Sequence, residues 1–273
     1  MMTPGMMVQD ILNQPDKWQF AGAKQLYAGI DLGTYKAIAI VIDETGKPRA
    51  ARIRRAEVVR SGLIVDYAGA QAMVHEMMEE MRAASPLPIE KGATSYPPKT
   101  EYANMDATRY ILEAAGLEVL SVLDEPSAAN RILKLQSGAI VDVGGGTTGI
   151  AVIEDNKIVF TADEATGGVH LSLVLAGNAK ISYEAAEKIK IDPRNHRKIL
   201  PIVRPVIEKM ASIVETVLQR FSHLKAVCLV GGTCELEGFT EIVGNILQLD
   251  VFRPEFPQFI TPLGIALSCL ETN

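Results

Sequence analysis

Several features that mark other protein classes are missing from this sequence. Its 273 residues include three cysteines, Cys228, Cys234 and Cys269, an odd number without C-x-x-C spacing, so neither a disulfide framework nor a zinc site is indicated. No apolar run approaches the ~20 residues that cross a bilayer. The first 27 residues also lack the basic start and unbroken apolar stretch of a secretion signal. Together these absences predict a cytoplasmic protein.

An excess of basic residues is also absent. The formal net charge is −6, whereas a non-specific nucleic-acid binder needs a basic surface, so we expect no nucleic-acid partner. His75-Glu76 begins like the H-E-x-x-H signature of zinc proteases, but residue 79 is glutamate, which excludes that interpretation. With 48% apolar and 22% charged residues, the chain has the composition of a globular protein, of a length that suits two compact lobes or one large domain.

The most informative feature that is present is an internal repeat. Ala28–Glu44 and Ala139–Asn156 each contain an apolar run, an aspartate, a glycine turn with threonine, and a second apolar run that ends in acidic turn residues. The β-branched runs separated by glycine predict a β-hairpin in each. Solenoid repeats recur every ~20–50 residues, so this much longer offset indicates two related lobes.

The rest of the chain alternates strand-like clusters with helix-like segments, which predicts α/β layers. Residues 1–26, rich in Met and Gln and broken by Pro4 and Pro15, read as a flexible extension outside the fold, with a short amphipathic helix as the alternative. We expect one lobe over residues 27–136, joined by a returning C-terminal helix at 262–273, and a second lobe over residues 137–261.

Two aspartate–glycine turns are the candidate phosphate and metal sites. In the first turn, Gly33 and Thr34 follow Asp31, and successive backbone N–H groups of such a turn can hold an anion. An aspartate beside a phosphate needs a cation between them, so Asp31 suits a water-mediated Mg²⁺ ligand. The alternative for this turn alone is a polar hairpin.

The second turn is more specific. Asp142 is followed by Gly144, Gly145, Gly146 and Thr147, and three glycines within a strand-like run often mark the close approach of another group. Asp142 and Thr147 therefore repeat the roles expected of Asp31 and Thr34, including the Mg²⁺ ligand.

Three further segments complete the candidate set. Gly231, Gly232 and Thr233 lie between a buried strand and a helix, where bare backbone could admit a flat adenine. Glu187 and Lys190 are three residues apart and share a helix face, although an exposed ion pair is the alternative. Glu125 precedes Pro126 and could orient an attacking water, or act only as a favourable helix N-terminal acid.

These segments occur in an order that resembles the nucleotide motifs of the actin/DnaK/sugar-kinase ATPase superfamily. The five segments are Asp31–Thr34, Glu125–Ala129, Asp142–Thr147, Gly231–Thr233 and Pro262–Ala266. The resemblance spans residues 27–270 and implies a mixed α/β, two-lobed actin-like ATPase fold made of duplicated ribonuclease H-like lobes. It further implies ATP or ADP with Mg²⁺ as cofactors and Glu125, Asp31 and Asp142 as catalytic residues.

Two other stretches extend the resemblance to particular families. Glu184–Lys190 is similar to the helix of DnaK and MreB whose Glu and Lys touch the adenosine, and Arg60–Asp66 is similar to a stretch of MreB. Ala93–Pro98, Gly116–Pro126 and Ala162–Gly168 resemble the EutJ family of ethanolamine-utilization proteins. That resemblance implies a chaperone-like ATPase homologue that works with ethanolamine-utilization enzymes or with proteins of the bacterial microcompartment.

The departures from the superfamily pattern predict ATP binding with slow hydrolysis. Only residues 192–195 separate the adenosine-type helix from the next one, so the outer subdomains are expected to be strongly reduced. Tyr35-Lys36 replaces smaller residues, and His170 stands where DnaK has an acidic one. The leading function is a chaperone-like, Mg-dependent ATPase of ethanolamine utilization. A non-catalytic actin-like scaffold is the alternative, and a small-molecule kinase ranks last because no base beyond Glu125 is evident.

Overall fold

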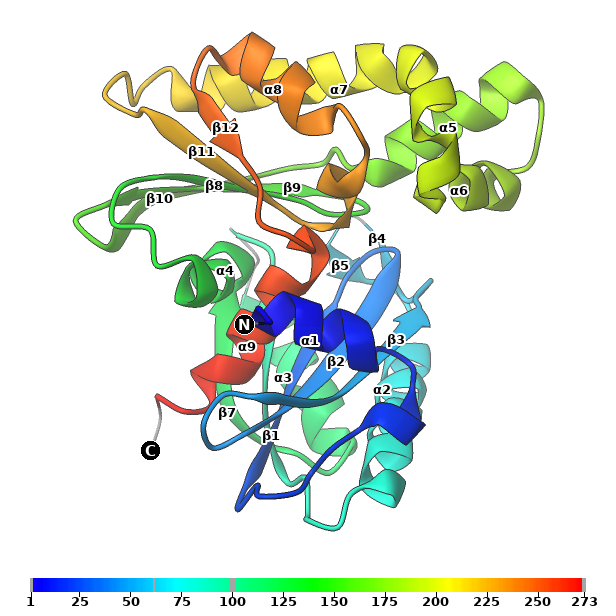
Figure 1. Ribbon diagram of the computed structural model, residues 1–273, viewed down its shortest axis with the longest axis vertical. Helices are drawn as coiled ribbons and strands as arrows, with labels where there is room; N and C mark the ends of the chain where they lie inside the picture. The colour runs from blue at the N-terminus through cyan, green and yellow to red at the C-terminus, as the bar shows by residue number, and fades with distance from the viewer. Residues whose placement is uncertain (1, 61, 99–101, 272–273) are drawn as a thin grey trace. The chain divides into compact units, whose positions relative to one another are not determined.

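The chain divides into two compact units. The computed structural model describes residues 2–60, 62–98 and 102–271 (Figure 1). Unit 1 comprises Met1–Lys134 and Phe259–Asn273, and unit 2 comprises Leu135–Gln258. These limits lie within a few residues of the expected lobes, except that the N-terminal segment joins unit 1. The chain passes from unit 1 to unit 2 after α4 and returns just before α9.

Unit 1 is built on a five-stranded sheet with the order β3-β2-β1-β6-β7. Its strands are β1 (Leu26–Leu32), β2 (Lys36–Asp43), β3 (Pro48–Arg55), β6 (Lys91–Tyr96) and β7 (Glu118–Asp124). A small two-stranded sheet, β4 (Val59–Arg60) with β5 (Leu63–Ile64), follows β3. The helices of unit 1 are α1 (Pro4–Ile11), α2 (Tyr67–Ala84), α3 (Tyr102–Ala114), α4 (Glu125–Leu133) and α9 (Ile260–Ser268).

Unit 2 repeats this topology with the order β10-β9-β8-β11-β12. Its strands are β8 (Gly138–Val143), β9 (Thr148–Glu154), β10 (Lys157–Glu164), β11 (Ala226–Val230) and β12 (Asp250–Phe252). Its helices are α5 (Gly168–Ala179), α6 (Tyr183–Ile191), α7 (His196–Leu218) and α8 (Phe239–Leu247). A short 3-10 turn, Pro193–Asn195, connects α6 to α7.

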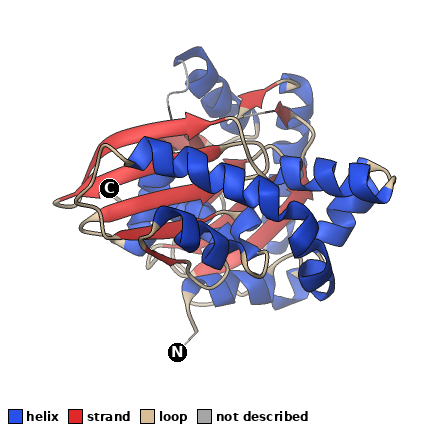
Figure 2. Ribbon diagram, turned by 90° about the horizontal axis from the view of Figure 1, so that it is seen from above, coloured by secondary structure: helices blue, strands red, loops and turns tan. Residues whose placement is uncertain are grey.

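The two sheets have the same mixture of strand directions. In each, the first three strands in the chain pair antiparallel, the fourth pairs in parallel with the first, and the fifth pairs in parallel with the fourth. Helices lie beside the strands, as Figure 2 shows, and supply the α layers. The expected pair of related α/β lobes is therefore present as two sheets of equal topology.

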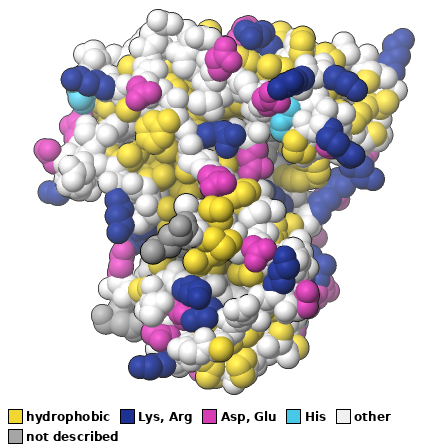
Figure 3. Space-filling model, viewed as in Figure 1, with side chains coloured by type: hydrophobic (Ala, Val, Ile, Leu, Met, Phe, Trp, Pro, Cys, Tyr) yellow, Lys and Arg dark blue, Asp and Glu magenta, His cyan; other side chains and the backbone are white. Residues whose placement is uncertain are grey.

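Apolar side chains on the strands and helices form the core of each unit. In unit 2 this core includes Val141 and Ile150 of the first hairpin, Val203 and Ile207 of α7, and Phe239 of α8, each at most 1% exposed. Burial of such side chains contributes ~1.5–3 kcal/mol each. On the face drawn in Figure 3, basic and acidic side chains are interspersed rather than gathered by sign.

The N-terminal segment packs onto unit 1, in contrast to the extension outside the fold that the sequence favoured. Val8 is fully buried, Trp18 is 8% exposed, and the Trp18 Nε1–H donates to the Ile11 carbonyl at 3.0 Å. Leu12 forms a parallel bridge to Ala51 on the edge of β3. The sequence alternative of a short amphipathic helix matches α1, because its apolar side chains find a surface on β3 and α9.

Helices α4 and α9 cross closely in unit 1. A Cβ placed on Gly264 would lie 1.8 Å from the Ala128 carbonyl oxygen, and one on Gly29 would lie 2.4 Å from the Ala266 nitrogen. Small residues therefore let α9 approach both α4 and β1 at backbone distance. In the described part of the chain, no helix has both the length and the hydropathy of a membrane span.

Candidate functional site

The first aspartate–glycine turn is a tight hairpin between β1 and β2 in unit 1. Asp31 is half-buried near the end of β1, and the Gly33 N–H donates to the Lys36 carbonyl at 3.1 Å. The Thr34 hydroxyl accepts a hydrogen bond from the Gly62 N–H at 3.4 Å. The turn thus places the carboxylate, the glycine and the threonine of the predicted phosphate motif within four consecutive residues.

Glu125 lies at the same edge of this sheet as Asp31. It is the first residue of α4, whose N-cap Asp124 accepts from the Ser127 N–H at 2.9 Å and from its hydroxyl at 2.5 Å. Strands β1, β6 and β7 are parallel neighbours, so their carboxyl ends meet at one edge. The half-buried Glu125 directly follows β7 and is therefore held by a capped helix at the edge that carries Asp31.

The second aspartate–glycine turn joins β8 to β9 in unit 2. Asp142 and Thr147 are each 8% exposed, and the Gly144 N–H donates to the Thr147 carbonyl at 3.0 Å. Gly231 closes over the aspartate, because a Cβ on Gly231 would lie 2.5 Å from Asp142 Oδ1. With φ at +90°, Gly231 also has a backbone conformation that glycine adopts most readily.

The glycine-rich turn is approached by the N-terminus of α5. The Gly168 N–H donates to the Gly144 carbonyl at 3.0 Å, and the Val169 N–H donates to the Gly145 carbonyl at 2.9 Å. A Cβ on Gly167 would lie 2.6 Å from the Gly145 oxygen. The three glycines predicted close approach by another group, and the backbone at the start of α5 is one such group. Gly146 is buried in the same turn.

Glu187 and Lys190 form a buried pair beside this turn. Lys190 Nζ donates to Glu187 Oε2 at 2.7 Å and to the Gly168 carbonyl at 2.9 Å, while the Ser172 hydroxyl donates to Glu187. Glu187 is 2% exposed, so the exposed-pair alternative is wrong. Burial lowers the pKa of Lys190, and the Glu187 carboxylate opposes that shift.

The third glycine segment meets the second turn through one hydrogen bond. The Thr233 hydroxyl donates to the Gly144 carbonyl at 2.8 Å, and Gly232 begins the short turn that carries it. A Cβ on Gly168 would lie 2.6 Å from Thr233 Oγ1 and 3.1 Å from Lys190 Nζ. Unit 2 therefore brings its predicted phosphate and adenosine segments together around the Gly144 carbonyl.

Several residues of this arrangement were not among the sequence candidates. Ser172, Gly167 and Gly168 contact the predicted residues, and the Gly-Gly pair between a strand and a helix was the available signal. Burial raises the pKa of Cys234 well above its ordinary value, and its thiol donates to the Val230 carbonyl at 3.1 Å. Such a buried thiol is unreactive rather than catalytic.

The carboxylates and glycine turns fit a magnesium–nucleotide complex in their chemistry. Within the described residues, no three His, Cys, Asp or Glu side chains lie close enough together to hold a metal by themselves. Mg²⁺ is commonly held by one or two carboxylates together with phosphates and water, and Asp31 and Asp142 each offer one. Because glycine has no side chain, the backbone N–H groups of both turns can face an anion.

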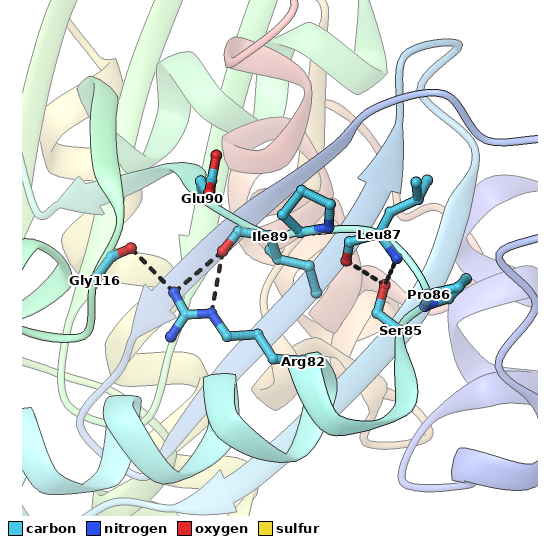
Figure 4. A pocket seen from close by; sticks show the side chains of 8 residues that line it. Arg82, Ser85, Pro86, Leu87, Ile89, Glu90 and Gly116 are labelled. Carbon is cyan, nitrogen blue, oxygen red and sulfur yellow. Dashed lines mark hydrogen bonds between the residues drawn. The ribbon is translucent and has the colours of Figure 1, made fainter.

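A separate depression of about 410 Å³ lies between the end of α2 and the start of β6 in unit 1 (Figure 4). Arg82 points across it and donates to the carbonyls of Ile89, Ala115 and Gly116, and to the Glu79 carboxylate. Because these bonds occupy all five guanidinium N–H groups, Arg82 ties the loop to the helix ends and has no donor left for a ligand.

Comparison with known proteins places the chain in a family. It is 41% identical to ethanolamine utilization protein EutJ of Escherichia coli over 248 residues, which cover 90% of this chain and 87% of the relative. The chain belongs to the EutJ family. The crystal structure of EutJ from Carboxydothermus hydrogenoformans matches with a TM-score of 0.89 and 43% identity, and covers 97% of this chain and 99% of that one.

More distant matches identify the fold that the chain shares with other proteins. The model of the type IV pilus assembly protein PilM matches residues 98–254. MreB5 of Spiroplasma citri bound to ADP gives a TM-score of 0.70 at 16% identity, covering 88% of this chain and 95% of that one. The chain is therefore a member of the actin/DnaK-like superfamily and has the actin-like ATPase fold.

Proposed function

We propose that this protein binds Mg·ATP and Mg·ADP and serves ethanolamine utilization as a chaperone-like, slow ATPase. The observation that carries the proposal is the convergence in unit 2 of the Gly144 turn, Gly168, Lys190 and Thr233, each in contact with another. Membership of the EutJ family supports the pathway, with its enzymes or microcompartment proteins as partners in the cytoplasm.

The candidate residues have the same role in each unit taken by itself. In unit 1, Gly33 and Thr34 would hold phosphate through backbone N–H and hydroxyl groups. In unit 2, Gly144–Gly146 and Thr147 would hold phosphate in the same way. Glu187, Lys190 and Gly231–Thr233 would hold the adenosine. Asp31 and Asp142 would hold Mg²⁺ through water, and the metal would neutralise phosphate charge when bound.

Hydrolysis would depend on the positioning of water rather than on covalent chemistry. Glu125 begins α4 and is held in place by the Asp124 cap, so its carboxylate can keep a fixed direction. A carboxylate in that position can accept a proton from, and orient, the attacking water. Because this carboxylate acts alone in that role, the expected turnover is slow.

The binding test uses the full-length protein and thermal unfolding. A ligand present at 100 times its dissociation constant stabilises the folded state by about 2.7 kcal/mol, so millimolar Mg·ATP should raise the melting temperature. Asp31→Ala and Asp142→Ala should reduce the part of this shift that EDTA abolishes. Asp250→Ala, which removes an exposed carboxylate on β12, is the matched control and should keep the full shift. A wild-type melting temperature that Mg·ATP leaves unchanged contradicts the proposal.

The turnover test separates the ATPase from a scaffold. Glu125→Gln keeps the shape and hydrogen bonding of the side chain, so it should stop ATP hydrolysis and preserve the Mg·ATP thermal shift. Hydrolysis at the wild-type rate by Glu125→Gln would remove Glu125 from the mechanism.

A non-catalytic actin-like scaffold is the second candidate. The PilM model that matches residues 98–254 describes a pilus assembly protein, which favours an adaptor that uses nucleotide as a structural ligand. Wild-type protein that binds Mg·ATP tightly and shows no phosphate release over hours would support this candidate over the ATPase.

A further inference from the structure

His196 lies where three segments of unit 2 meet. It is the first residue of α7, and its side chain is only 6% exposed. Nε2 lies 3.1 Å from the Lys190 carbonyl, and Nδ1 accepts a hydrogen bond from the Glu237 N–H at 3.1 Å. A carbonyl can only accept and an amide N–H can only donate, so these partners require a neutral ring with its proton on Nε2.

The two partners of His196 belong to the two segments expected to hold the adenosine. Lys190 is on α6, and its Nζ is bound to Glu187 and to the Gly168 carbonyl. Glu237 follows the turn of Gly232–Glu235, in which Thr233 donates to the Gly144 carbonyl. The imidazole therefore joins the end of α6 to the connection between β11 and α8 through these two hydrogen bonds.

Other contacts near this bridge differ in burial. Arg197 pairs with the Glu237 carboxylate at 3.0 Å, but the Arg197 side chain is 86% exposed, and such surface pairs contribute ~0–1 kcal/mol. A Cβ on Gly238 would lie 2.7 Å from Leu200 Cδ2, which shows that α7 also packs directly under the turn. The His196 bonds are buried and directional, so they fix the separation of the two segments more strictly than the exposed pair does.

We propose that His196 is a positioning residue for the adenosine half of the nucleotide site. It sets the spacing between Lys190 and the Gly231–Thr233 segment, so that both contact one nucleoside. This inference rests on the proposed nucleotide binding and adds a residue that controls its affinity. The hydrogen bonds that His196 makes in the described structure go to Lys190 and Glu237 rather than to the Gly144 turn, so phosphate binding should depend much less on His196.

The test compares two substitutions that each keep one bond. His196→Gln places an amide donor near Nε2 and keeps the Lys190 bond. His196→Asn places an acceptor near Nδ1 and keeps the Glu237 bond. Arg197→Gln is the control, because it removes an exposed contact between α7 and the same residue, Glu237. Affinities for Mg·ATP, Mg·ADP and magnesium tripolyphosphate are measured by calorimetry on full-length protein at pH 7.5.

Each His196 variant should bind Mg·ATP and Mg·ADP about tenfold more weakly, which is the loss of roughly one hydrogen bond. Tripolyphosphate affinity should stay within about twofold of wild type, as should every affinity of Arg197→Gln.

The outcomes distinguish this inference from the proposed function. Wild-type protein that binds neither Mg·ATP nor Mg·ADP overturns both. Wild-type binding together with unchanged ATP affinity in both His196 variants overturns the positioning role alone. An equal loss of ATP and tripolyphosphate affinity in the variants also overturns it, because that pattern reports general loss of structure.

Discussion

The two units share one strand order but use it differently at equivalent turns. At the site end, the Gly33 turn of unit 1 bonds within its own hairpin and to Gly62. The matching Gly144 turn of unit 2 receives backbone N–H groups from α5 and the hydroxyl of Thr233. The extra glycines of unit 2 thus allow the chain to pack against itself. The glycines that distinguish the second repeat from the first therefore serve packing within the protein, as well as the proposed contact with a ligand.

The opposite ends of the same hairpins show the reverse contrast. In unit 1, Asp43 is 1% exposed, accepts from Thr45 and Lys47, and pairs with Arg49, whose Nη1 also donates to the carbonyls of Gln19 and Ala21. In unit 2, the corresponding turn at residues 155–156 lies at the surface with both residues at positive φ. The turn at Asp43 is buried because the N-terminal segment covers it, whereas the turn at residues 155–156 has no such cover and stays exposed.

The largest expected effect tests the buried Glu187–Lys190 pair beside the glycine-rich turn of unit 2. Glu187→Gln removes the carboxylate that faces the charged Lys190, and breaking a buried pair in this way costs about 3–5 kcal/mol. Urea unfolding at pH 7, followed by circular dichroism, should show this loss. Glu184→Gln, on the exposed face one turn earlier, should change the free energy of unfolding by less than about 1 kcal/mol.

The pH dependence of that effect follows from the lysine. Burial, the larger cause, already lowers the folded-state pKa of Lys190 in the wild type, against the Glu187 carboxylate. The folded state therefore binds fewer protons than the unfolded state. The destabilisation caused by burying the Lys190 charge falls as the pH rises toward the pKa of lysine in the unfolded chain, about 10.4. Loss of Glu187 lowers the pKa further, so the gap between wild type and Glu187→Gln should narrow from pH 7 to pH 10. A constant gap would show that packing, not charge, causes the loss.

The crossing of α4 and α9 tests whether the units are separately stabilised. Gly264→Ala places a Cβ against the Ala128 carbonyl and should destabilise unit 1 by about 3 kcal/mol. Trp18, the only tryptophan, lies in unit 1, so its fluorescence should report this loss, and Glu187→Gln should leave it unchanged. Gly177→Ala on α5 is the control, because a Cβ there meets nothing within 4 Å and should stabilise by ~0.5–1 kcal/mol. Coincident shifts of fluorescence and dichroism in every variant would show one cooperative molecule.

The smallest effect compares the two outer turns. Burial alone would raise the pKa of Asp43, but hydrogen bonds from Thr45, Lys47 and Arg49 outweigh it and hold that pKa below its ordinary value. A depressed carboxyl pKa stabilises the fold above the unfolded value of about 3.9, and this stabilisation is lost as the pH falls through the folded value. Asp43→Asn should therefore cost about 2 kcal/mol at pH 7 and progressively less below about pH 4. Asn156→Gly in the exposed turn should change stability by no more than about 0.5 kcal/mol at either pH.

The turns of the candidate site could be predicted because their motifs are local. An aspartate at the end of a strand followed by glycine and threonine specifies a hairpin turn through backbone preferences alone, and both such turns are present. The contacts of Gly144 with Gly168 and Thr233 join residues that are distant in sequence, and no local pattern encodes them. His196 lies in no sequence motif, since its contacts with Lys190 and Glu237 depend only on where α7 begins.

The sequence by itself determined the duplication, the α/β class and the order of the glycine turns, because hydrophobic periodicity and turn chemistry act over a few residues. Tertiary structure decided the rest. The N-terminal segment is part of unit 1 because β3 and α9 offer its apolar side chains a surface. Glu187 and Lys190 are a buried pair because α6 packs against α5, which brings Ser172 and the Gly168 carbonyl to them. Burial depends on which surfaces meet, and only the folded chain specifies that.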